Sequence, residues 1–96
     1  MEPLYLIATI HPDMAHAEDV ERILRDMMAA TRSESGCELY DLVVDPEHPD
    51  TWLMLEKWAS RAAWEAHMDS RHNVEGNAQL RGKLRAETEL RFWSAK

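Results

Sequence analysis

The stretch LEKWASRAAWEAHMDSRHN, residues 55–73, decides how the rest of the chain is arranged. It begins as an apolar strand and continues into a helix that is rich in Trp and His. Bulky aromatic surface lies here beside two groups that can move protons near neutral pH: Trp58, Trp64, His67 and His72. This combination favours a pocket for a small aromatic ligand, and the alternative is that these side chains only fill the core.

The composition is that of one globular domain. The chain has 96 residues, of which 45% are hydrophobic and 30% are charged. Its net charge of -7 argues against nucleic acid or an anionic membrane as a partner, since both require clustered Lys and Arg. The single Cys37 cannot form an internal disulfide, and neither a leader nor an apolar span of about eighteen residues is evident. We therefore expect a cytoplasmic protein.

A strand and a helix are predicted at the start of the chain. Residues 4–10 are a short apolar run rich in β-formers, which His11-Pro12-Asp13 ends. From about Ala15 to Arg32 the apolar residues follow one helical stripe, with Val20, Ile23, Leu24, Met27, Met28 and Thr31. Gly36 is then expected to end this helical segment.

Two further strands are predicted over residues 37–45 and 51–58. The turn between them, residues 46–50, contains two prolines and is short enough to make the pair an antiparallel hairpin.

The rest of the chain predicts helical segments and a last strand. Ser60 is a good N-cap for a helix that ends near Met68. Ser70 caps a further helical segment, through about Lys83, that Gly76 interrupts or loosens. Apolar and charged residues then alternate as in a half-buried strand, over residues 84–93.

The element order β-α-β-β-α-β predicts an α+β, ferredoxin-like fold as a single domain over residues 1–96. This fold has a four-stranded antiparallel sheet with its helices on one face. The first and third strands are apolar on both faces, however, and the helices cover only one of them. Two such sheets packed face to face would cover the remaining apolar face of each sheet, so we predict a two-fold homodimer.

Three groups of residues carry a resemblance to a known family. They are residues 34–41 (ESGCELYD), Glu56-Lys57-Trp58, and Ala66-His67 followed by Ser70-Arg71-His72. With these residues the chain resembles the antibiotic biosynthesis monooxygenase family, including its quinol monooxygenase-like members. The resemblance spans nearly the whole chain and implies a dimeric α/β barrel of two ferredoxin-like units.

The resemblance implies oxygenation of an electron-rich quinol or phenol by O2, without metal or flavin. The protein must then take a phenolic proton, hold the anion and exclude water. His67 is the candidate base, because an imidazole titrates near neutral pH, and Trp58 is the second catalytic candidate. The alternative for His67 is a hydrogen bond within the core, and the alternative for Trp58 is core packing.

The candidate substrate-binding residues are Tyr40, Glu56, Trp64, His72 and Asn73. Tyr40 and Trp64 would wall a planar ring, and the Tyr40 hydroxyl would donate to an oxyanion. Glu56, if buried, would either orient His67 or join an ion pair. His72 and Asn73 would bind a substrate oxygen or simply begin a helical segment.

No metal and no other cofactor is predicted. His67 and His72 are five residues apart, which does not place two ligands on one face of a helix, and no Cys pair completes a site. Haem-degrading relatives carry an Asn in their first strand, and residues 4–11 contain none. The alternative function is a ligand-binding or stress-related dimer without catalysis, and haem degradation is a weaker alternative.

Overall fold

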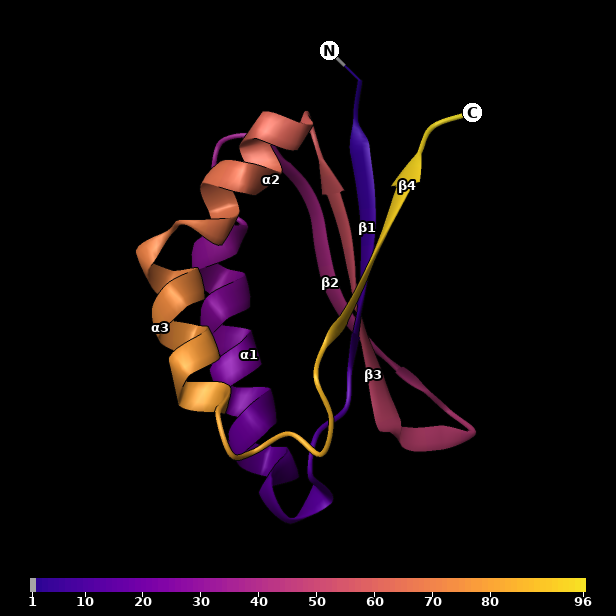
Figure 1. Ribbon diagram of the computed structural model, residues 1–96, viewed down its shortest axis with the longest axis vertical. Coiled ribbons are helices and arrows are strands. Elements are labelled where there is room, and N and C mark those ends of the chain that lie inside the picture. The colour runs from indigo at the N-terminus through magenta and orange to yellow at the C-terminus, as the bar shows by residue number, and fades with distance from the viewer. Residues whose placement is uncertain (1) are drawn as a thin grey trace.

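The four strands form one antiparallel sheet in the order β2-β3-β1-β4, the ferredoxin-like topology that the sequence predicts. A computed structural model describes residues 2–96 (Figure 1). The elements are β1 (Leu4–Ile10), a single 3-10 turn (Met14–His16), α1 (Ala17–Thr31), β2 (Cys37–Asp45), β3 (His48–Trp58), α2 (Arg61–Met68), α3 (Arg71–Leu80) and β4 (Glu89–Ser94).

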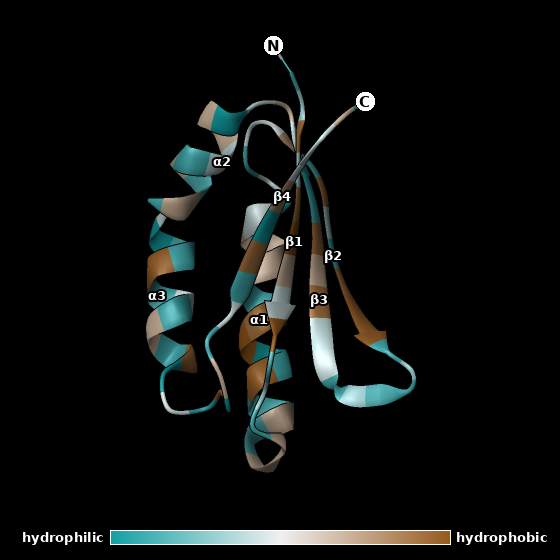
Figure 2. Cartoon of the chain, turned by 45° about the vertical axis from the view of Figure 1, so that its right-hand side comes forward, coloured by the Kyte–Doolittle hydropathy of each residue, from teal (hydrophilic) through white to brown (hydrophobic). Residues whose placement is uncertain are grey.

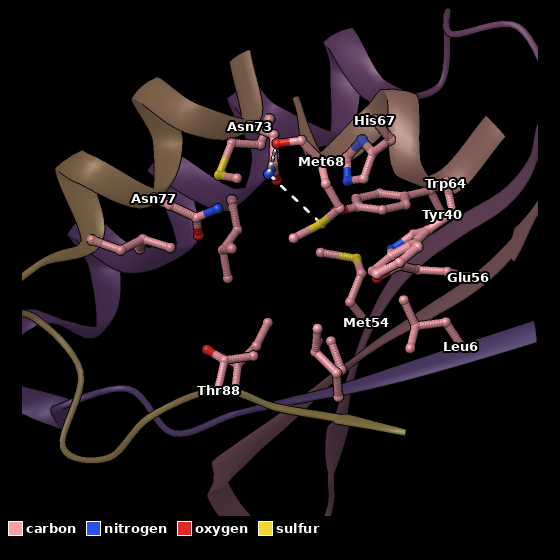
Figure 3. Close-up of a pocket in the computed structure, with 16 residues that line it drawn as sticks. Leu6, Tyr40, Met54, Glu56, Trp64, His67, Met68, Asn73, Asn77 and Thr88 are labelled. Carbon is pink, nitrogen blue, oxygen red and sulfur yellow. Dashed lines mark hydrogen bonds between the residues drawn. The ribbon is translucent and has the colours of Figure 1, made fainter. Parts of the chain in front are cut away.

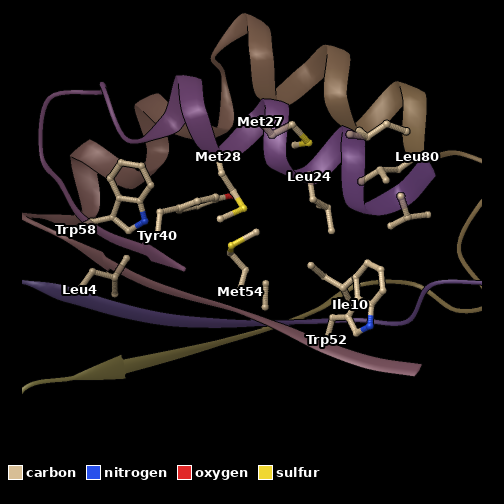
Figure 4. Packing of buried hydrophobic residues seen from close by; sticks show 13 residues of the cluster. Leu4, Ile10, Leu24, Met27, Met28, Tyr40, Trp52, Met54, Trp58 and Leu80 are labelled. Atoms are coloured by element: carbon tan, nitrogen blue, oxygen red, sulfur yellow. The ribbon is translucent and has the colours of Figure 1, made fainter. Parts of the chain in front are cut away.

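All three α-helices lie on one face of the sheet (Figure 1). The core fills the layer between them, where the predicted stripe of α1 meets alternate residues of the strands. Figure 4 shows this layer, which includes Leu24 and Met28 of α1, Tyr40 of β2, and Met54 and Trp58 of β3. In the register of the sheet, Leu6 of β1 and Tyr40 of β2 both pair with Glu56 of β3, which places the three on the helix side.

The helical region after β3 is broken into two helices, as its two serine caps predict. The Ser60 hydroxyl accepts from the Ala63 amide at the start of α2, and the Ser70 hydroxyl accepts from the Asn73 amide at the start of α3. The break between Met68 and Ser70 turns the chain, so α3 packs along α1.

Gly76 does not loosen α3, contrary to the prediction. It lies inside the helix, and an added Cβ would come 2.2 Å from the Met27 sulfur. The missing side chain therefore allows α1 and α3 to approach closely, which the sequence pattern alone could not reveal.

Two strands differ from their predicted bounds. β3 begins at His48 rather than at residue 51, because Asp45 accepts from the Glu47 amide and pairs with His48, which tightens the turn. β4 begins at Glu89 rather than at residue 84, and residues 81–88 form a connection that bridges to Pro12 instead. In the single chain β4 is exposed along its length rather than half-buried.

The sheet face away from the helices carries many apolar side chains. Tyr5, Ile7, Leu53 and Leu55 are only partly buried there, and Trp93 is 45% exposed. In Figure 2 hydrophobic segments follow the strands, whereas the hairpin between β2 and β3 is hydrophilic. Among residues 2–96, no helix combines the length and the apolar character needed to cross a membrane.

Candidate functional site

A cavity of about 170 Å³ lies between the sheet and the helices (Figure 3). Apolar side chains form most of its wall, among them Leu6, Ala8, Leu24, Met54, Met68 and Leu90. Its polar groups come from five elements or connections and include Tyr40, Glu56, His67, Asn73, Asn77 and Thr88. An apolar enclosure with a few convergent polar groups is typical of a small-molecule site.

His67 lies at the end of α2 with only 3% of its side chain exposed. Its ring packs on Trp58 at 4.8 Å between centroids, and the Tyr40 ring meets it edge-on at 5.6 Å. Nδ1 donates to Glu34 Oε2 at 2.8 Å, since an ionised carboxylate can only accept. The proton on Nδ1 leaves Nε2 as the basic nitrogen, and in Figure 3 the ring nitrogen farther from the backbone points toward the cavity.

Burial lowers the pKa of His67, although the bond to Glu34 acts in the opposite direction. The neutral imidazole therefore dominates at neutral pH. A neutral His held by a carboxylate on one nitrogen can accept a proton on the other.

Glu34 reaches His67 from the turn between α1 and β2. The Glu34 amide donates to the Thr31 carbonyl, and the Cys37 amide donates to the Glu34 carbonyl. Gly36 has a φ of +86°, and an added Cβ would lie 2.7 Å from the Ala63 Cβ of α2. Only glycine thus allows this turn to lie against α2, which brings the Glu34 carboxylate to the His67 ring.

Glu34 was not among the predicted site residues. It stands 33 positions before His67, and no sequence spacing links the two. The only signal was its place in the run at residues 34–41, which carries the family resemblance.

Glu56 is 6% exposed and accepts from the Trp58 indole nitrogen at 3.0 Å. It therefore neither orients His67 nor joins an ion pair with a Lys or Arg, the two roles considered from sequence. Burial, with a smaller contribution from the Glu34 charge, raises the pKa of Glu56 to about 7.

Burial also raises the pKa of the Tyr40 phenol. The Tyr40 hydroxyl therefore stays protonated at neutral pH and can donate a hydrogen bond to a ligand.

Trp64 of α2 and Asn73 of α3 also line the cavity wall. The Trp64 ring meets the Phe92 ring of β4 edge-on at 4.9 Å, which joins helix and sheet beside the cavity. The Asn73 amide donates to the Met68 carbonyl at 3.2 Å and so ties the start of α3 to the end of α2. The Asn73 side chain thus has a structural partner as well as a place in the wall.

Five of the seven predicted site residues line the cavity: Tyr40, Glu56, Trp64, His67 and Asn73. Trp58 is fully buried and supports the His67 ring from behind. His72 lies outside the cavity wall, where its Nε2 is 3.2 Å from Glu34 Oε1. The structure therefore divides the predicted set into a cavity group and two residues behind it.

The break between α2 and α3 brings His67 and His72 together in spite of their spacing. Their ring centroids are 6.0 Å apart, with Glu34 bridging the two. The spacing argument against a shared site applies only within one helix, whereas His67 and His72 lie on two helices separated by the break that the serine caps predict.

Comparison with known proteins gives a consistent result. The family model described as antibiotic biosynthesis monooxygenase matches residues 3–79. The chain is 30% identical over 78 residues to the Mycobacterium tuberculosis protein named "Putative monooxygenase Rv0793", covering 81% of this chain and 76% of that protein. The solved structure of Rv0793 has a TM-score of 0.92 at 26% identity, covering 98% of this chain and 95% of that chain. The structure of PA3566 from Pseudomonas aeruginosa is 33% identical with a TM-score of 0.91, covering 100% and 96%.

Proposed function

Because the chain belongs to the antibiotic biosynthesis monooxygenase family, we propose that it is a cofactor-independent monooxygenase that oxidises a small aromatic quinol or phenol with O2. The observation that carries this proposal is the Glu34–His67 pair at the wall of an apolar cavity. It supplies a neutral, oriented base where an aromatic ligand would bind.

The size and lining of the cavity suit a single substituted ring. Its volume of about 170 Å³ is close to the roughly 150 Å³ of an engineered apolar cavity that binds benzene. Trp64 and Met54 would contact the faces or edges of such a ring, and the Tyr40 hydroxyl would hold its oxygen. A large planar cofactor would require more room than this single-chain cavity offers.

The proposed reaction starts with transfer of a phenolic proton to His67 Nε2. The resulting anion gives one electron to O2, and the substrate radical and superoxide combine to form a peroxide. Loss of water from the peroxide leaves one oxygen atom on the ring, so a quinol and O2 become a hydroxyquinone and water. The substrate supplies all four electrons, and the protein needs only to move protons, hold the anion and exclude water.

Trp58 and Glu34 fix the His67 ring for this step. Trp58 stacks on one side, and the Glu34 carboxylate both selects the tautomer and stabilises the imidazolium that forms. Glu56, with a pKa near 7, is poised to return a proton to the peroxide or the leaving water.

We also propose that the protein is a homodimer in which a second copy covers the open sheet face. Tyr5, Leu55 and Trp93 supply aromatic and aliphatic surface for that contact. A C2 interface of this kind would leave the helix side, and therefore the cavity, on the outside of the paired sheets.

Oxygen uptake tests the proposed function. Metal-stripped protein is assayed with a panel of quinols and phenols, beside His67→Gln and the control His48→Gln, whose side chain is 67% exposed at the hairpin. Chelator-resistant uptake above the protein-free rate is expected for wild type and His48→Gln. A fall of about a hundredfold or more is expected for His67→Gln. If all three match the protein-free rate, the monooxygenase proposal fails for those substrates and the ligand-binding alternative replaces it.

A further inference from the structure

We propose that Glu34, His67 and His72 form a binding site for one divalent transition-metal ion, zinc being the expected ion. The donor atoms are Glu34 Oε1 or Oε2, His67 Nδ1 and His72 Nε2. They all lie within 4.8 Å of one another. Two imidazoles and one carboxylate are a donor set that zinc and neighbouring metals accept, with further positions left for water.

The distances in the cluster are close to those that an ion requires. The Glu34 carboxylate is 2.8 Å from His67 Nδ1 and 3.2 Å from His72 Nε2. A tetrahedral zinc with bonds of about 2.0–2.1 Å holds its ligand atoms about 3.3 Å apart. Small rotations of Glu34 and His72, which are 18% and 26% exposed, would open the cluster enough to admit the ion.

Three separate elements hold the donors in place. Glu34 is fixed by the turn at Gly36, and His67 by its stacking on Trp58. His72 lies in the first turn of α3, where the Ser70 hydroxyl is 3.2 Å from its Nε2. A site built from three converging elements is more preorganised than a pair of ligands on one helix.

The surroundings favour a cation, and His72 gives access from solvent. A surface pocket beside His72 is also lined by Asp26 and Glu75. Each of these carboxylates lies beside an arginine, Asp26 at 3.8 Å from Arg22 and Glu75 at 2.9 Å from Arg71. The attraction for cations therefore comes mainly from the net charge of -7 of the whole chain.

An ion at this site would change the protonation of His67. Coordination through Nδ1 requires a neutral imidazole with its proton on Nε2, the nitrogen assigned to the substrate. A bound ion would therefore inhibit turnover by removing the base. This consequence rests on the proposed function, whereas the binding itself does not.

The test is isothermal titration of chelator-treated protein with zinc, together with cobalt absorption as a spectroscopic probe of the coordination. Wild type is compared with His72→Gln and Glu34→Gln, and with His48→Gln, which lies near Asp45 far from the cluster. Circular dichroism confirms that each variant is folded. We expect one zinc per chain, affinity more than about tenfold weaker in the first two variants, and no change in His48→Gln.

Equal zinc affinity in wild type, His72→Gln and Glu34→Gln, or no binding to any of them, would overturn the metal site. The proposed function is tested separately, by measuring turnover of the substrate by wild type with and without zinc. Specific binding without inhibition would support the metal site and count against His67 as the base. Absence of binding with intact turnover would remove the metal site and leave the monooxygenase proposal standing.

Discussion

His67 Nδ1 lies 2.8 Å from Oε2 of Glu34, a residue on a turn 33 positions earlier in the chain. This contact fixes the tautomer of a buried imidazole at the wall of the cavity. The proposed chemistry depends on this contact, because it directs the basic nitrogen of His67 to the substrate.

Substitution Glu34→Gln should release that tautomer. A carboxylate can only accept from Nδ1, whereas a Gln side chain can accept from Nδ1 or donate to it, and donation would place the proton on Nε2 and turn the base into a donor. Nitrogen-15 NMR of the histidine ring should report an unprotonated Nε2 in wild type and a mixed or reversed state in the variant. Glu38→Gln, on the exposed pair with Lys57, is the control. An unchanged His67 spectrum in Glu34→Gln would show that an acceptor oxygen is enough and that the negative charge of Glu34 is not needed to set the tautomer.

Glu56 should make the stability depend on pH. Its folded pKa of about 7 lies above the ordinary value of 4.5, so the folded state binds more protons than the unfolded state between these values. The contribution of Glu56 to the free energy of unfolding therefore falls by about 3 kcal/mol as the pH rises from about 4.5 to about 7. Urea unfolding at pH 5 and pH 8 measures this change.

Glu56→Gln should remove this loss of stability. The free energy of unfolding of Glu56→Gln, relative to that of wild type, should therefore increase from pH 5 to pH 8. His67, whose pKa is lowered by burial, has the opposite sign and is common to both proteins. The result that contradicts the assignment is a constant difference between the two proteins at both pH values.

Gly36→Ala should destabilise the protein more than Gly82→Ala does. Both glycines have positive φ, at +86° and +79°, so both substitutions carry the cost of a left-handed residue. At Gly36 the added methyl would also lie 2.7 Å from the Ala63 Cβ, whereas nothing lies within 4 Å at Gly82. We expect an additional loss of about 1–3 kcal/mol for Gly36→Ala in urea unfolding. Equal losses would mean that the turn does not pack against α2 as described.

Leu55→Glu should yield a monomer if the open sheet face is the dimer interface. A carboxylate in the centre of an apolar contact would lack a partner. The control is Val74→Glu, because Val74 is 58% exposed on α3, away from the sheet face. Sedimentation velocity should report a dimer for wild type and Val74→Glu and a monomer for Leu55→Glu. A dimer for all three would place the interface elsewhere.

Local patterns predicted most of the fold correctly. A short apolar run rich in β-formers predicted β1, the helical stripe predicted α1, and Ser60 and Ser70 marked the starts of α2 and α3. The start of β4 was predicted too early because alternation continues through residues that instead form a connection. Alternation of apolar and charged residues indicates which side chains face the sheet, but it does not show whether a neighbouring strand is there to pair with.

The site was harder to predict because its key contacts are long-range. The cavity residues Tyr40, Trp64 and His67 stood out by type, whereas Glu34 is one acidic residue among many and depends on the turn at Gly36. The serine caps predicted the helix break between His67 and His72, but the angle between the two helices, which brings the rings together, depends on how α3 packs along α1.

An anaerobic titration tests the central claim, that His67 takes the proton of a phenol bound in the cavity. Without O2 the reaction stops after proton transfer, so a phenolate would accumulate and show its red-shifted absorption. At a pH below the pKa of the free ligand, wild type should bind it as the phenolate and His67→Gln should bind it as the phenol. Binding as the phenol to both proteins, or as the phenolate to both, would contradict the assignment of His67 as the base.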